Sequence, residues 1–149
     1  MLKRFTFWLW MAVVFMLLNA TFHSLSLFFQ PEPQNETERQ LIQLMTTYRH
    51  DLGAGFRPTM ANLVTALSSC FSLLCLLGGL MNAYLLKKRV AAGIMRGVVL
   101  INLLVFAICF VMMAVFTFLP PIILTGLILL FLILALVTVL RSAATFAVK

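Results

Sequence analysis

Charged residues are scarce in this sequence, and acidic residues are the scarcest of them. Asp and Glu together number 4 and Lys and Arg 11, so charged residues make up only 10% of the 149 residues. Hydrophobic residues make up 63%, and the mean hydropathy is +1.09. Soluble domains are roughly 45–50% apolar and about 25% charged. A chain this apolar cannot cover itself with polar surface, which excludes a soluble domain and indicates an integral membrane protein.

Ionisable residues are also missing from the middle of every long apolar run. Such residues inside a membrane usually mark proton relays and ion pathways. Small multidrug exporters have a similar length, but their mechanism needs a membrane-embedded carboxylate. The absence of one here disfavours a proton-coupled transporter of that kind.

Loop cysteines and catalytic motifs are absent as well. Cys70, Cys75 and Cys109 all lie in apolar runs, where cysteine behaves as a small hydrophobe. A disulfide oxidoreductase is therefore disfavoured. The sequence contains no P-loop, HExxH, GxSxG or clustered Cys and His residues. We expect no metal and no cofactor, and an enzyme that uses His23 or His50 as acid or base is the weakest of the functions left open.

Four apolar runs are long enough to cross a membrane as helices. They are continuously apolar, whereas the strands of membrane barrels alternate apolar and polar residues. The predicted spans form a single transmembrane domain, 1–149, and cover about 5–28, 59–86, 98–118 and 121–140. The predicted fold is an all-α membrane protein, an antiparallel four-helix transmembrane bundle.

The basic residues predict the orientation of this bundle. Of the 11 basic residues, Arg39, Arg49 and Arg57 share one side with all four acidic residues, and the other eight lie on the opposite side. The positive-inside rule then places both termini in the cytoplasm. The net charge of +7 could suggest nucleic acid as a partner. Because the charges sit in short clusters between apolar runs, without a binding motif, we expect no nucleic acid.

The outer loop, 30–58, has the pattern of a short helix. Leu41, Leu44, Met45 and Tyr48 follow one another at spacings of three and four, which places them on one helix face. Asn35 with a Glu three residues later resembles a capping box. We predict a short amphipathic helix on the outer ends of the bundle, which serves as a lid on its own protein or as a partner surface.

Polar residues in the first two spans lie on one face of each helix, toward the outer side. These candidate ligand-binding residues are Asn19, His23 and Ser26 in the first span and Asn62, Thr65 and Ser69 in the second. We expect the two faces to meet, either as hydrogen bonds between helices or as a small pocket. In the loop, His50 and Asp51 are candidate partners, with Asp51 expected to reach His23. Leu17 is expected on a different face.

Glycines mark two further positions. Gly78 and Gly79 in the second span would let a neighbouring helix approach closely. Gly93 and Gly97 have GxxxG spacing before the third span. They are expected in a flexible turn, with a helix contact as the alternative.

The layout resembles that of small uncharacterised bacterial four-span integral membrane proteins. The matching features are FHSLSLFF at the end of the first span, an outer loop with a short helix, and a second span that enters through FRPTMANL and ends past GG. The resemblance implies a four-helix architecture and a bacterial inner membrane, and it implies no activity.

The sequence thus favours a non-enzymatic integral membrane protein that acts through helix, partner or lipid contacts. Membrane lipid is the expected partner, and a protein partner or a homo-oligomer stays open. The alternative is a small-molecule or lipid carrier or sensor that uses a polar pocket between the first two spans near the outer face.

Overall fold

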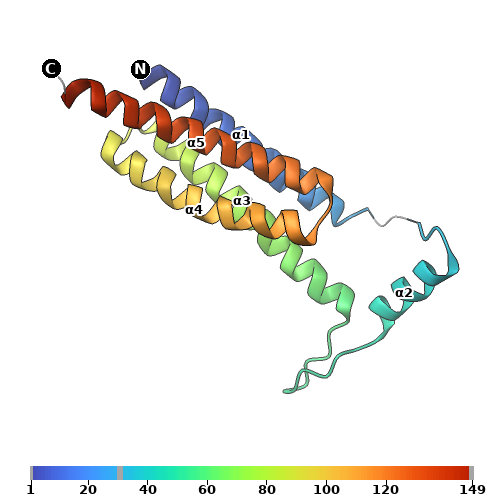
Figure 1. Cartoon of the computed structure of the whole chain (residues 1–149). Helices are drawn as coiled ribbons and strands as arrows, with labels where there is room; N and C mark the ends of the chain where they lie inside the picture. Colours follow the sequence, from blue (N-terminus) through green and yellow to red (C-terminus); the bar gives the residue numbers. More distant parts are fainter. Residues whose placement is uncertain (1, 30–31, 148–149) are drawn as a thin grey trace. The chain divides into compact units, whose positions relative to one another are not determined.

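The described residues form α-helices that are connected by loops. A computed structural model describes the backbone of residues 2–29 and 32–147, and the side chains of 4–29 and 32–140. Gln30 and Pro31, which begin the predicted outer loop, lie outside the described residues. Figure 1 traces the five helices, which are α1 (Leu2–Ser26), α2 (Glu36–Thr47), α3 (Met60–Lys87), α4 (Ala92–Phe116) and α5 (Leu119–Ala147).

Four of these helices are long and apolar enough to cross a membrane. The qualifying stretches are Arg4–Ser26, Met60–Lys87, Ala92–Phe116 and Leu119–Leu140. Each exceeds the roughly 20 residues that a hydrocarbon core of about 30 Å requires. The prediction of an all-helical chain with four membrane-length helices is confirmed.

The start of α4 differs from the prediction. The helix begins at Ala92, so the segment with Gly93 and Gly97 is helical and not a flexible turn. The amide of Met95 donates to the carbonyl of Ala91 at 3.1 Å, which closes the first turn. Each glycine costs a helix about 1 kcal/mol relative to alanine, and the good helix formers around them outweigh this cost. A Cβ on either glycine would meet no described atom within 4 Å, so the described residues show no helix contact of this pair either.

The described chain forms two compact units. The first comprises Met1–Ala20 and Leu74–Lys149, and the second comprises Thr21–Leu73. Helices α1 and α3 each contribute to both. The single transmembrane domain expected from the sequence stays a prediction.

The core of the first unit is built from one face of each helix. In α1 the buried apolar residues recur at spacings of three and four, as one helix face requires. They are Phe5, Leu9, Ala12, Val13, Met16 and Ala20. In α5 the face consists of Thr125, Ile128, Leu132 and Ala135. The ring of Phe131 stacks on Trp8 at 5.9 Å and on Phe15 at 5.3 Å between centroids, which joins α5 to α1.

Small residues allow the helices of this unit to approach closely. A Cβ on Gly79 would lie 2.8 Å from Cδ2 of Leu17, and one on Gly126 would lie 3.2 Å from Cε2 of Phe110. The close approach predicted at the Gly78–Gly79 pair is therefore confirmed at Gly79. Leu17, which was expected on a different face from Asn19, also packs against α3, at Gly79. Connected by two residues, α4 and α5 pack against one another.

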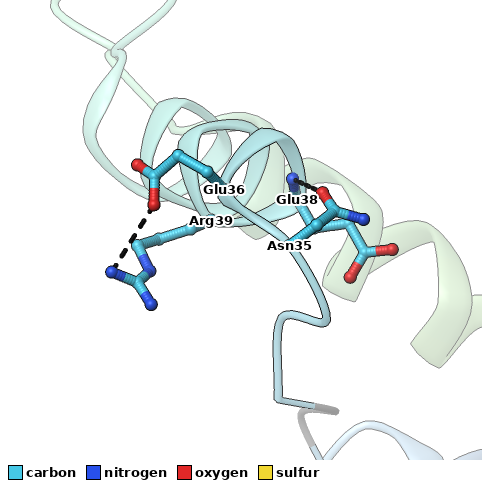
Figure 2. A network of polar contacts seen from close by, with 4 residues as sticks. All are labelled: Asn35, Glu36, Glu38 and Arg39. Carbon is cyan, nitrogen blue, oxygen red and sulfur yellow. Dashed lines mark hydrogen bonds and ion pairs between the residues drawn. The ribbon is translucent and has the colours of Figure 1, made fainter.

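Helix α2, in the second unit, begins at a side-chain cap, as Figure 2 shows. The carboxamide oxygen of Asn35 accepts a hydrogen bond from the amide of Glu38 at 2.9 Å. The carboxylate of Glu38 accepts from the amide of Gln34, one residue earlier than in a standard capping box. An ion pair between Glu36 and Arg39 follows within the first turn. The helix predicted here is present, and none of its residues is buried.

The loop from α2 to α3 folds back on itself. Arg49 and Thr59 form an antiparallel bridge, and the amide of His50 donates to the carbonyl of Pro58 at 2.9 Å. The tip turns through Gly53 and Gly55, which have φ values of 81° and 83°. Glycine adopts this left-handed conformation without steric cost. The loop therefore has a defined hydrogen-bonded frame.

Candidate functional site

Asn19, the deepest of the predicted polar residues in α1, faces α3. Its side chain is only 3% exposed, and its amide donates to Sγ of Cys75 at 3.5 Å. An amide in hydrocarbon needs a hydrogen-bonding partner, since leaving it unpaired costs several kcal/mol. The partner is the thiol of Cys75, six residues beyond Ser69 in α3, and not one of the three α3 residues predicted for this face.

His23 makes its contacts with α3 inside the second unit. The ring meets Phe71 edge-on, with centroids 5.1 Å apart, and the backbone of Ser68 lies beside the imidazole. Ser26 donates to the carbonyl of His23 at 2.7 Å, along its own helix. His23 thus joins α1 to α3 through a backbone group and an aromatic ring.

The three candidate residues of α3 serve their own helix. Thr59 is the residue that precedes α3, and its hydroxyl donates to the carboxamide oxygen of Asn62 at 3.0 Å. The amide of Asn62 in turn donates to that hydroxyl at 3.2 Å, so the pair caps the helix. Ser69 donates to the carbonyl of Thr65, one turn back, and Thr65 is exposed. These bonds satisfy the start of a helix and do not demand a ligand.

The loop candidates also find local partners. Asp51 forms an ion pair with Arg57 at 3.1 Å and accepts a hydrogen bond from the amide of Gly53 at 3.0 Å. Its carboxylate is therefore engaged within the loop and not with His23. The ring of His50 meets Tyr48 edge-on at 4.9 Å. That the six span residues and these two loop residues form one ligand site stays a prediction.

Ser72 is an exception to this local pairing. Its hydroxyl is buried and is the one buried side-chain N or O atom without a hydrogen-bond partner in the described part of the chain. A serine in a membrane helix commonly donates to the carbonyl four residues back. For Ser72 that residue is Ser68, and this bond is not formed.

A polar contact that the sequence interpretation missed joins α3 and α4. The amide of Asn102 donates to the carboxamide oxygen of Asn82 at 3.3 Å. Each amide also donates to its own helix, Asn82 to Gly78 at 2.7 Å and Asn102 to Val98 at 2.9 Å. Asn82 is only 1% exposed. Two asparagines in successive spans, both near the short connection between them, were the signal available in the sequence.

A half-open recess of about 200 Å³ lies beside this asparagine pair. Its walls come from α3 and α4 and are mostly apolar. They include Leu74, Leu77, Met81, Val98, Ile101 and Phe106. The amides at the wall are bonded to each other and to helix backbones, so the recess presents hydrocarbon to an occupant.

Metal-binding side chains do not gather in the residues that the structure describes. No group of three His, Cys, Asp or Glu residues is close enough there to hold an ion. All three cysteines are free thiols.

These features define the class of the protein. Four long apolar helices, with large apolar side chains on their outer faces, are those of a multi-pass integral membrane protein. No family model, curated protein or solved structure matches the chain.

Proposed function

We propose that this protein is a non-enzymatic membrane protein that acts through contacts of its helices with lipid or with a protein partner. One observation carries the proposal: the buried amides of the spans bond within the protein, while large apolar side chains face outward. Asn19 and Asn82 are buried and paired, whereas Leu77 is 62% and Ile108 59% exposed. Outward apolar surface favours recognition by packing, the main source of helix association in lipid.

Cross-linking in living cells tests this proposal. A photoreactive residue at Ile108 should form adducts with lipid or with one defined protein, because that position faces outward. The same residue at Val99, which is fully buried in the same helix and does not line the recess between α3 and α4, is the matched control and should form none. Adducts of equal yield at both positions would contradict the proposed outer contact surface.

The proposed bundle is antiparallel, with both termini in the cytoplasm of a bacterial cell and α2 as an amphipathic helix on the outer side. The basic connection between α3 and α4 supports this orientation. Single cysteines at Gln34 and Phe118, in a background without the three natural cysteines, should react with an impermeant thiol reagent in intact cells. A cysteine at Ala92 should not react. Labelling at Ala92 alone would invert the topology.

A lipid carrier or sensor is the second candidate. The sequence placed its pocket between the first two spans. The recess between α3 and α4 is the observation that favours a lipid site, and its apolar walls suit an acyl chain better than a polar solute.

A further inference from the structure

Basic residues follow the lining of the recess along α3. Met81 lines the recess, and Lys88 follows it by seven residues, which is two helical turns on the same face. At 1.5 Å per residue, Asn82 lies about 9 Å along the helix axis from Lys88. An acyl chain in the recess would therefore reach the level of Lys88 with its head.

The first unit, to which Lys88 belongs, contains no acidic residue. All four acidic residues of the chain lie within 32–51, in the second unit. The ammonium of Lys88 lies over the ring of Tyr84, 5.7 Å from its centroid. This contact holds the charge at the end of α3 and leaves its hydrogen-bond donors open to an anion.

Arg89 occupies a backbone position that usually belongs to glycine. Its φ is +50°, and the amides of Arg89 and Val90 donate to the carbonyls of Leu86 and Leu85 at 3.2 and 3.4 Å. This is a Schellman ending, in which glycine is the common residue at the left-handed position. Arginine is strained in this backbone conformation, whereas glycine would not be. The chain therefore has a positive charge here at a cost in backbone energy.

From these observations we propose that the recess binds an anionic phospholipid, with one acyl chain between α3 and α4 and the headgroup phosphate at Lys88 and Arg89. Basic residues beside a groove between spans favour anionic headgroups. The site deepens the proposed function and rests on it, because it names the lipid contact. Arg96 is excluded from the site, since it lies two residues before Val98 and hence on another face of α4.

Lipid binding to the whole purified protein in detergent tests the site. Native mass spectrometry would follow the first bound molecule during titration with phosphatidylglycerol or with phosphatidylcholine. Phosphatidylglycerol should bind at least fivefold more tightly. Glycerol 3-phosphate, which has the charged group without the chains, should not bind. Equal affinity for the two lipids, or equally tight binding of glycerol 3-phosphate, would overturn the proposal.

Variants of the basic residues separate the site from general charge. Lys88→Gln should lower phosphatidylglycerol affinity about fivefold. Arg96→Gln removes the same charge on the same side of the bundle and should leave the affinity unchanged. Arg89→Gly should weaken binding while the melting temperature stays equal or rises, since the backbone strain is relieved. An equal loss in Lys88→Gln and Arg96→Gln would overturn the headgroup assignment.

A variant of the recess tests the position of the chain. Ile101→Phe should fill the recess and weaken phosphatidylglycerol binding at least fivefold. Ile108→Phe is the matched control two turns along the same exposed face, outside the recess, and should bind as the unchanged protein does. If Ile101→Phe does not fold, the exposed Lys88→Gln decides the question. These binding measurements in detergent do not depend on the topology of the protein in the membrane. If phosphatidylglycerol does not bind as expected while Ile108 still cross-links in cells, the lipid site is wrong and the proposed function stands.

Discussion

Leu17 of α1 lies so close to Gly79 of α3 that a Cβ on the glycine would be 2.8 Å from Cδ2 and 3.0 Å from Cγ of the leucine. Real Cβ atoms essentially never make contacts below 3.0 Å, so a larger residue at this position must shift the Leu17 side chain or α1. The glycine lets the two helices pack closely at this point.

Gly79→Ala should therefore destabilise the protein by about 1–3 kcal/mol, the usual cost of overpacking. Thermal unfolding in detergent, followed by circular dichroism, measures this loss. Gly93→Ala is the matched control, because a Cβ there meets nothing and alanine favours the helix by about 1 kcal/mol. Equal melting temperatures for both variants would show that the close approach is not formed.

Asn19→Leu should lower stability by about 0.6–1.7 kcal/mol, the range for hydrogen bonds between membrane helices. The change removes the donor to Cys75 at similar side-chain volume. Leu18→Ala, at an outward position that is 38% exposed, should have a smaller effect and serves as the control in the same melting experiment. A larger loss in Leu18→Ala would place the polar residue outside the packed interface.

Asn82 and Asn102 should be energetically coupled across α3 and α4. In a double-mutant cycle with Asn82→Leu and Asn102→Leu, we expect a coupling of about 1 kcal/mol, because either single change already removes the hydrogen bond between the two side chains. Reversible unfolding in detergent with added denaturant measures the four free energies. Strict additivity would mean that the 3.3 Å hydrogen bond contributes nothing.

Asn35→Ala should weaken the start of α2 without affecting the spans. The lost cap is worth about 1 kcal/mol, which corresponds to roughly fivefold faster amide exchange in the first turn. Hydrogen exchange read at Glu38, whose amide donates to Asn35, measures the change. Thr37→Ala, inside the same helix and exposed, should leave the exchange rate nearly unchanged. Uniform acceleration over α3 as well would point to global unfolding instead.

Residue pairing in the loop shows where local sequence signals were sufficient. The cap of α2 was predicted from Asn35 and Glu38, because a capping box is local and needs three residues of separation. The pairing of Asp51 with Arg57 was not predicted. It depends on the turn at Gly53 and Gly55, whose backbone reverses the chain and brings the two charges together.

By itself the sequence determined the class of protein, the four membrane-length helices and their approximate bounds. The reason is that backbone groups in hydrocarbon must bond within one segment, so a run of about 20 apolar residues has little choice but a helix. Only the tertiary structure decided which faces meet. Lipid and protein interior are equally apolar, so periodicity does not mark the inward face of a span. The rotation of α1 against α3 follows from contacts such as Leu17 on Gly79, and that rotation pairs Asn19 with Cys75.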